Sequence, residues 1–402
     1  MFVDFTPEQE ALRQQIRSYY RRLLTPEVRA DLAADEEGGA GGSASRLTGS
    51  SAYRRVVRRM GQDGWLGVGW PKEYGGQGFT PIEQFIFWDE TYRARAPLPI
   101  IPVNTIGPAI MRFGSEEQKR EYLPRILSGE LHFGVGYTEP GAGTDLAALR
   151  TRAERVGDEY VINGQKIFTT HGHDCDYIWL AARTDPDAPK HKGISILLVP
   201  TSAPGYSVTP IHTLGGERTN ATYYEDVRVP VANRVGPENG GWALVTSQLN
   251  HERITLATPG TADRLLDEVW RWAARTDAPD GGKMLEREWV QAALARVYAK
   301  LEALKLLNWR SAWSLTAGHP RMEEASAVKV LGTELFVECY RLLLEITGEA
   351  GLLRGGEPGA LFGGLLEHAY RSAVTLTFGG GVNEVQRDII AMAGLGLPRA
   401  RR

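Results

Sequence analysis

The spacing of apolar positions predicts a chain that is helical at both ends and β-rich in the middle. In the first 130 residues, and again from Gly241 onward, apolar residues recur with a period of about 3.6, as on one face of a helix. Thr6-Pro7-Glu8 and Ser115-Glu116-Glu117 each combine an N-cap residue with acids in the first turn, which is typical of a helix start. The pattern predicts helices near residues 7–24, 53–63, 81–93, 115–128, 242–276, 284–317, 321–347 and 361–378.

Between residues 131 and 237 the apolar positions follow a strand pattern instead. Asn163-Gly164 separates two β-prone runs and predicts a two-residue hairpin turn. About six predicted strands without intervening helices favour a barrel or a sandwich over a Rossmann sheet. The sequence therefore predicts a helical N-terminal domain, a middle β-domain and a C-terminal helical domain, over residues 1–130, 131–237 and 238–402. A glycine-rich stretch at residues 36–51 is predicted to be a surface loop.

Composition excludes several classes of protein. Of the 402 residues, 42% are hydrophobic and 24% are charged, as in a globular rather than a disordered chain. A net charge of −3 argues against a protein that binds nucleic acid or a membrane surface through a basic excess. Cys175 and Cys339 are too few for a disulfide scaffold or a zinc site, and the histidines show no metal-ligand spacing. Since the start lacks signal-peptide features and no long apolar run occurs, we expect a cytoplasmic protein without a membrane span.

The first candidate site is the segment Tyr137-Thr138-Glu139-Pro140-Gly141-Ala142-Gly143-Thr144-Asp145, which leaves a predicted strand. Its two glycines would let backbone amides face an anionic or heteroaromatic ligand, and its two threonines add hydroxyl donors. An ordinary glycine turn explains the same residues equally well. The segment lacks the G-x-G-x-x-G spacing of a dinucleotide site, and no βαβ unit surrounds it.

Two other segments could also contact a ligand. Phe168-Thr169-Thr170 places an aromatic ring beside two hydroxyls, which could stack on a flat cofactor, although a plain strand is the simpler interpretation. Gly379-Gly380-Gly381 separates two predicted helices, so its bare amides could bind an oxyanion. The same glycines also serve as a helix stop.

Glu252 is the candidate general base. It is predicted on the same helix face as Trp242 and Val245, where an unpaired carboxylate would cost several kcal/mol. Its pKa would then rise, as suits a base that works near neutral pH. An ion pair with Arg253 or another cation is the alternative.

Taken together, these segments resemble the acyl-CoA dehydrogenase family over essentially the whole chain. The resemblance is carried by Y-T-E-P-G-A-G-T-D (137–145), N-G-Q-K-I-F-T-T (163–170) and F-G-G-G-V-N-E-V-Q-R (378–387), in the family's order and separation. It implies a helical N-terminal domain, a middle β-barrel and a C-terminal four-helix bundle, with FAD bound between barrel and bundle. It also implies that an acyl-CoA thioester is desaturated between Cα and Cβ, and that electrons pass to an electron-transfer flavoprotein.

The resemblance assigns roles to the candidate residues. The residues it assigns to FAD are Tyr137, Thr138, Gly143, Thr144, Phe168, Thr169 and Thr170. Phe168 stands where the family usually has a tryptophan over the flavin, so the stacking surface is kept and an N–H is lost. Thr170 matches the threonine that faces flavin N5.

The catalytic base departs from the commonest family pattern. Many members carry it in the C-terminal turn as Tyr-Glu-Gly, where this chain has only glycines at residues 379–381. A subset, including the isovaleryl and long-chain types, instead places the glutamate on the first bundle helix, and Asn250-His251-Glu252-Arg253 is similar to that subset. The resemblance therefore implies that Glu252 takes the α-proton while a hydride passes from the β-carbon to flavin N5. The backbone N–H of Gly380 is implied as a donor to the thioester oxygen.

A second departure concerns the ADP half of FAD. Homotetrameric members lend two segments to a neighbour's FAD, and the corresponding stretches here are residues 283–289 and 345–351. Glu345 and Glu349 would face the pyrophosphate, and at ~4 Å each would repel a phosphate charge by about 4 kcal/mol at an effective dielectric constant of ~20. We therefore expect a heteromer in which a related subunit completes the FAD site.

The chain is most similar to the actinobacterial steroid-catabolic members of the family, which assemble as α2β2. This similarity implies a bulky steroid side-chain acyl-CoA as substrate. Two alternatives stay open at this point, namely a flavin oxidase of the same fold and a non-catalytic structural subunit whose partner holds the base.

Overall fold

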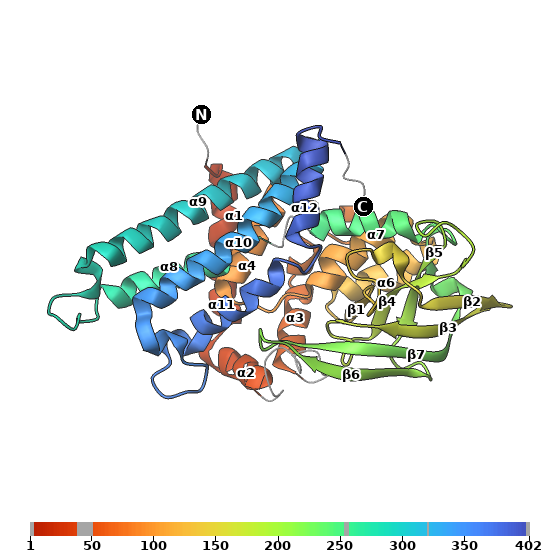
Figure 1. Cartoon of the computed structure of the whole chain (residues 1–402), viewed down its shortest axis with the longest axis horizontal. Helices are drawn as coiled ribbons and strands as arrows, with labels where there is room; N and C mark the ends of the chain where they lie inside the picture. The colour runs from red at the N-terminus through yellow and green to blue at the C-terminus, as the bar shows by residue number, and fades with distance from the viewer. Residues whose placement is uncertain (1–3, 38–50, 253–256, 320, 399–402) are drawn as a thin grey trace. The chain divides into compact units, whose positions relative to one another are not determined.

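The chain follows the predicted order of helices, strands and helices. The computed structural model describes residues 4–37, 51–252, 257–319 and 321–398, except for the side chains of residues 35–37 and 248–252. The helices are α1 (Pro7–Leu23), α2 (Pro26–Glu37), α3 (Ala52–Gln62), α4 (Pro81–Ala94), α5 (Gly107–Phe113), α6 (Glu116–Leu127), α7 (Gly241–Glu252), α8 (Gly260–Ala273), α9 (Glu288–Thr316), α10 (Met322–Thr347), α11 (Leu365–Leu376) and α12 (Asn383–Ile389) (Figure 1). The strands are β1 (Phe133–Gly136), β2 (Arg152–Val156), β3 (Glu159–Lys166), β4 (Tyr177–Arg183), β5 (Ile194–Pro200), β6 (Tyr206–His212), β7 (Arg218–Pro230) and β8 (Arg234–Val235).

The helices and strands belong to two compact units that do not follow chain order. The first, here called the helical unit, contains Met1–Arg22, Thr80–Ala96 and Arg253–Arg402. The second, here called the sheet unit, contains Leu23–Phe79 and Pro97–Glu252. In the helical unit, α4 packs against α8 and α9 although about 170 residues separate them in sequence. These two units are groups of residues in mutual contact and differ from the three predicted domains. The predicted domain boundaries near residues 130 and 237 therefore stay a prediction.

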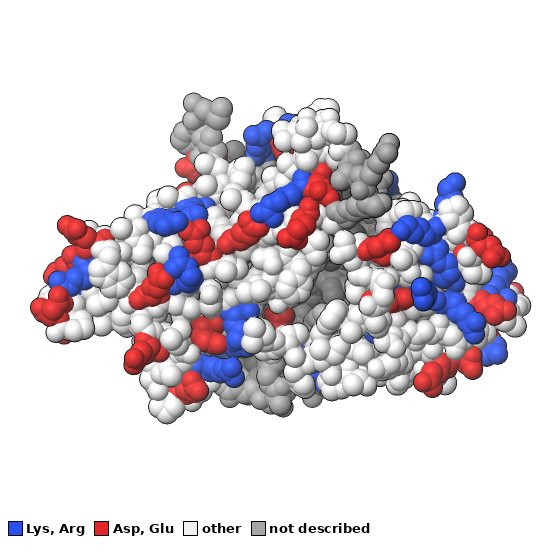
Figure 2. All heavy atoms as spheres, in the orientation of Figure 1, with Lys and Arg blue, Asp and Glu red and all other residues white. Residues whose placement is uncertain are grey.

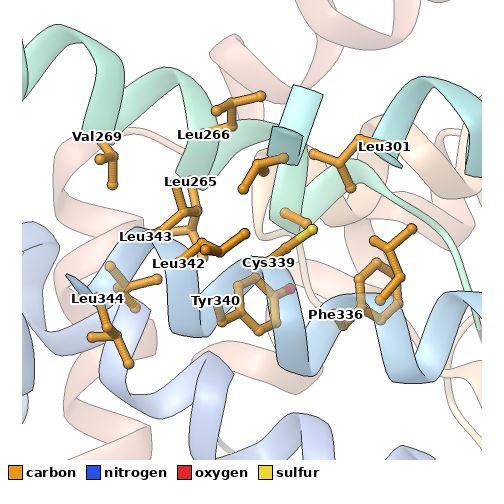
Figure 3. Packing of buried hydrophobic residues seen from close by; sticks show 14 of the residues in the cluster. Leu265, Leu266, Val269, Leu301, Phe336, Cys339, Tyr340, Leu342, Leu343 and Leu344 are labelled. Carbon is orange, nitrogen blue, oxygen red and sulfur yellow. The ribbon is translucent and has the colours of Figure 1, made fainter. Parts of the chain in front are cut away.

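Leucine-rich faces of α8, α9 and α10 form the core of the helical unit. Figure 3 shows Leu265 and Leu266 of α8, Leu301 of α9, and Cys339 and Leu343 of α10 pointing toward one another. These side chains are almost completely buried. Cys339 and Leu343 are four residues apart, so they lie on one face of α10.

The single helix predicted over residues 242–276 is wrong. The chain instead forms α7 and α8, which begin at Gly241 and Gly260. Pro259 lacks a backbone N–H and its ring clashes with the preceding turn, so a continuous helix through this position is disfavoured. Gly260 also lies against α4, and a Cβ there would meet the backbone oxygen of Asp89 at 2.2 Å.

Asp89 is a partly buried acid at this crossing of α4 and α8, and its Oδ1 is buried. Its Oδ1 has no hydrogen-bond partner within the described part of the chain. Burial raises the pKa of Asp89 to about 7, and the neighbouring carboxylates of Glu90 and Asp263 add to the rise, whereas Lys305 and Arg13 oppose it. The carboxyl group is therefore protonated in the folded chain at a pH where it would be ionised in the unfolded chain.

We expect Asp89→Asn to reduce the pH dependence of stability. Between the ordinary pKa of 3.8 and about 7, the folded chain keeps a proton that the unfolded chain has lost. The stability from this group is thus complete below 3.8 and is lost as the pH rises through about 7, by roughly 1.4 kcal/mol per pH unit. Thermal midpoints should show the variant gaining on the wild type across this range. Asp187→Asn, at an exposed turn, is the control, and a pH-independent difference for Asp89→Asn would contradict the prediction.

The β-domain is one eight-stranded sheet. Seven strands follow the order β6-β7-β3-β2-β4-β5-β8, and β1 pairs in parallel with β4. Alternate residues of β3 point into the core, where Tyr160, Ile162 and Lys166 are completely buried. The predicted strands are present, and β6, which the sequence did not predict, lies at one end of the order with its side chains half-buried or exposed.

The hairpin turn predicted at Asn163-Gly164 is wrong, because these residues lie inside β3, opposite a β-bulge in β7. The register between β3 and β7 shifts at this point, and the two side-chain polar atoms of Asn163 bond Asp226 on β7 at 2.9 and 3.0 Å. A Cβ at residue 164 would meet Thr151 at 2.6 Å, so the close approach of β2 requires glycine. The true turn joins β2 to β3 at Gly157, which has φ 63°.

The described surface carries charges of both signs. On the face drawn in Figure 2, lysines and arginines alternate with aspartates and glutamates. This mixture agrees with the absence of a basic excess in the sequence. Among the described residues, no helix is both long and apolar enough to cross a membrane.

Candidate functional site

Two of the predicted segments meet at the strand ends of the sheet unit. The backbone N–H of Ile167, just after β3, donates to the carbonyl oxygen of Thr138, just after β1, at 2.8 Å. This bond ties Tyr137-Thr138 to the segment that begins at Phe168, although about 30 residues lie between them in sequence. The structure therefore brings together the two segments that the sequence associated with a flat cofactor.

Tyr137 anchors this junction from inside. Its side chain is buried, and Trp179 Nε1 on β4 donates to its hydroxyl oxygen at 3.0 Å. Lys166 Nζ donates to its carbonyl oxygen, also at 3.0 Å. The Tyr137 side chain is thus held in place by the protein.

A buried ion pair, which the sequence did not predict, lies directly beneath the junction. Lys166 is completely buried, and its Nζ lies 2.8 Å from Oε1 of Glu139. The Glu139 carboxylate also accepts from the backbone N–H groups of Arg150 and Thr151 at 2.7 and 2.8 Å. These bonds connect the loop after β1 to the residues just before β2 and to the last residue of β3.

The pKa shifts of the pair follow from burial and from mutual attraction. Burial lowers the pKa of Lys166 to about 8, and Glu139 limits that fall. Burial alone would raise the pKa of Glu139, but the Lys166 charge and the backbone N–H groups hold it below its ordinary value. Both groups are therefore charged near neutral pH.

Phe168 and Thr170 face outward while Thr169 holds the backbone between them. The N–H of Thr169 donates to the Asn220 carbonyl oxygen, and Asn220 Nδ2 donates back to the Thr169 oxygen, both at 2.9 Å. Thr169 is completely buried, whereas the Phe168 residue is 58% exposed and Thr170 is exposed. We call residues 168–170 the platform. Hydrogen bonds to Asn220 fix its backbone, and it exposes the Phe168 ring and the Thr170 side chain.

The backbone of this platform is strained. Phe168 has φ 61° and His171 has φ 62°, which is the left-handed region that non-glycine residues rarely adopt. Each such conformation costs on the order of 1–3 kcal/mol. Together with an exposed ring, this strain fits a segment shaped to receive a planar group such as a flavin.

The glycine loop after β1 is open on its outer side. Gly143 and Thr144 are exposed. A Cβ at Gly141 or Gly143 would meet no described atom within 4 Å, and neither residue has a positive φ. Neither chain packing nor backbone conformation within the described residues therefore requires these two glycines, and close approach of a ligand would explain them.

The predicted base lies at the edge of what the structure describes. Glu252 is the last residue of α7, and its side chain is outside the described part, as is Arg253. Earlier in α7, Leu244 and Val245 are buried, and Trp242 contacts His191 with ring centroids 4.8 Å apart. Trp242 and Val245 belong to the predicted apolar face, whereas Leu244 points to another side of the helix. The burial of that face at Glu252, and with it the role of Glu252, stays a prediction.

The glycine turn belongs to the helical unit. It joins α11 to α12, and Gly380 and Gly381 have φ 67° and 100°, as the predicted helix stop requires. Gly380 is exposed. In the same unit, Glu345 is exposed and forms an ion pair with Arg341, which offsets part of the repulsion expected from its carboxylate. Glu349 is also exposed.

The sequence matches three domains described for one family along its length. Residues 6–130, 134–227 and 239–395 match the N-terminal, middle and C-terminal domains of acyl-CoA dehydrogenases. The chain is 54% identical to acyl-CoA dehydrogenase FadE26 of Mycobacterium tuberculosis, over the full length of both proteins.

The chain is also similar in structure to solved members of this family. A chain of the ChsE4-ChsE5 complex from Mycobacterium tuberculosis superimposes with a TM-score of 0.91 at 54% identity, and the match covers 100% of both chains. A chain of the Tcur3481-Tcur3483 steroid ACAD superimposes with a TM-score of 0.91 at 51% identity, again over 100% of both chains.

Proposed function

Because this chain belongs to the acyl-CoA dehydrogenase family, we propose that it is the base-bearing subunit of a heteromeric, FAD-dependent enzyme that desaturates a steroid side-chain CoA thioester. Its similarity to a chain of the ChsE4-ChsE5 complex and to a steroid ACAD supports the heteromer and the substrate class. The observation that carries the proposal is the platform of Phe168, Thr169 and Thr170, which is bonded from below and exposes an aromatic ring beside a hydroxyl.

The platform and the loop after β1 are proposed to hold the flavin end of FAD. When bound, FAD supplies the acceptor for the hydride that leaves the substrate β-carbon. The Phe168 ring offers a stacking surface, and the residues proposed to give polar or backbone contacts are Tyr137, Thr138, Gly143, Thr144, Thr169 and Thr170. The buried pair of Lys166 and Glu139 keeps these two segments in register.

Glu252 and Gly380 are proposed to act on the acyl thioester. Glu252 takes the proton from the α-carbon, and as it leaves, negative charge develops on the thioester oxygen. The N–H of Gly380 donates to that oxygen, which stabilises charge that is present only as the reaction proceeds. An electron-transfer flavoprotein is proposed as the partner that would take up the electrons.

The split cofactor site gives a direct experiment. We expect the chain purified alone to hold little FAD, and the chain co-expressed with a related acyl-CoA dehydrogenase subunit to hold a full complement, because acids stand at residues 345 and 349 in the region proposed for the pyrophosphate. Flavin absorbance and protein concentration together give the occupancy.

The same complex tests the substrate class. Under anaerobic conditions, a CoA thioester with a steroid ring system and side chain should bleach the flavin more than about tenfold faster than straight-chain thioesters. Full flavin loading of the chain alone would contradict the heteromer, and preferential bleaching by straight chains would contradict the steroid substrate.

A further inference from the structure

A buried lysine lies directly beneath the glycine turn that joins α11 to α12. Lys329 on α10 is completely buried. Its Nζ donates to the carbonyl oxygens of Thr377 and Gly381 at 3.1 and 2.7 Å, and to Oδ1 of Asn383 at 2.6 Å. The three acceptors match the three N–H groups of an ammonium ion. One side chain therefore holds the end of α11, the last glycine of the turn and the first residue of α12.

Neighbouring residues on the same face of α10 hold the far side of the turn. Ser326 Oγ donates to Oε1 of the buried Gln386 at 2.9 Å. Asn383 Nδ2 donates to Thr333 Oγ1 at 3.1 Å, and the N–H of Asn383 donates to the Thr377 oxygen at 3.0 Å. Since these positions recur at helical spacing, α10 presents a polar buried stripe that is matched to the turn.

The turn has little freedom between these supports. Gly380 and Gly381 both have positive φ. A Cβ at Gly381 would lie 2.8 Å from Gln386 Nε2, so the turn lies directly against that amide. Gly380 and Gly381 are exposed, whereas Lys329 and Gln386, which lie against the turn from within, are completely buried.

We infer that Lys329 is a positioning residue that fixes the glycine turn so that the Gly380 N–H reaches the thioester oxygen. This inference rests on the proposed function of Gly380. A left-handed glycine alone is enough to stop a helix, so a buried cation is more than a simple stop requires. Burying an ammonium is costly unless each N–H is bonded, and Lys329 meets that condition with acceptors on both sides of the turn. A misplacement of 1 Å can cost about 10²-fold in rate.

The test uses Lys329→Met in the flavin-loaded complex. We expect kcat to fall by about 10²-fold with KM changed by less than about threefold, because the lost interaction serves the transition state. A second readout is the thioester carbonyl stretch of a bound 3-thia acyl-CoA labelled with ¹³C at that carbonyl. A hydrogen bond from Gly380 lowers the frequency in the wild type, and the lowering should be smaller in the variant.

Lys305→Met is the matched control, because Lys305 is a largely buried lysine of the same unit that bonds Asp263 on α8 and Glu302 on its own helix, α9, away from the glycine turn. It should lower the thermal midpoint without moving the carbonyl frequency or kcat. If Lys329→Met does not fold, Asn383→Ala removes one of the three acceptors and should shift both readouts in the same direction.

The outcomes separate the two proposals. A wild-type carbonyl frequency that does not change on binding would contradict the role of Gly380 and, with it, the inference about Lys329. A wild-type shift that persists in full, with unchanged kcat, in the Lys329 and Asn383 variants would overturn the inference about Lys329 alone.

Discussion

Replacing Glu252 by glutamine is expected to lower turnover of the acyl-CoA thioester by about 10²- to 10⁴-fold, the usual contribution of a positioned general base. Glutamine keeps the size of the side chain and can still donate and accept hydrogen bonds, but it cannot take a proton from carbon. The flavin content of the complex and the KM should change little, because Glu252 is not among the proposed flavin contacts and glutamine fills the same space. The measurement is steady-state turnover with an artificial electron acceptor.

Glu117→Gln supplies the matched control for this variant. Glu117 lies on the exposed side of α6, and the substitution changes the same charge. Its turnover should equal that of the wild type. If Glu252→Gln retained wild-type turnover, the base would lie elsewhere, and the chain would fit the alternative of a non-catalytic structural subunit.

The second large effect is on stability. Lys166→Met is expected to lower the free energy of unfolding by about 3–5 kcal/mol, because it leaves the Glu139 carboxylate buried beside two backbone N–H groups without its cation. Urea unfolding of the chain, followed by tryptophan fluorescence, measures the change. The double variant with Glu139→Gln should recover part of the loss, since the unpaired charge is then removed.

The neighbouring exposed pair gives the control. Lys190 Nζ lies 2.6 Å from Oδ2 of Asp145, in the same loop region, but both side chains are more than half exposed. Lys190→Met should therefore cost no more than about 1 kcal/mol. Equal effects of the two lysine variants would show that burial of the Lys166 pair does not strengthen its contribution.

Local periodicity explains why much of the fold could be predicted. The helix predicted over 53–63 is α3, at Ala52–Gln62, and the one predicted over 321–347 is α10, at Met322–Thr347. Apolar spacing is a local property, so it survives without knowledge of tertiary contacts. The packing of α4 on α8 could not be predicted in this way, because it depends on residues such as Gly260 whose close approach to Asp89 is visible only in three dimensions.

The candidate site shows the same division. The segment at Phe168–Thr170 was singled out because an aromatic ring beside two hydroxyls could contact a flat ligand, and the structure shows which of these side chains are exposed. Lys166 was missed because a lysine in a strand is normally read as solvent-facing, although its two-residue alternation with Ile162 and Tyr160 placed it on the inner face. Asn163-Gly164 was misplaced because its hairpin signal is local, whereas its place inside β3 depends on contacts with Asp226 of β7 and with Thr151, directly before β2.

Proton transfer can be separated from oxidation to test the central claim, that Glu252 of this chain is the base. In a 3-thia acyl-CoA, sulfur replaces the β-carbon, so the thioester keeps its acidic α-hydrogens but cannot lose a hydride from that position. Exchange of these hydrogens in D₂O, followed by NMR, reports the base alone. The wild-type complex is predicted to catalyse the exchange and the flavin-loaded Glu252→Gln complex to have lost it, whereas exchange at the wild-type rate in that variant would contradict the claim.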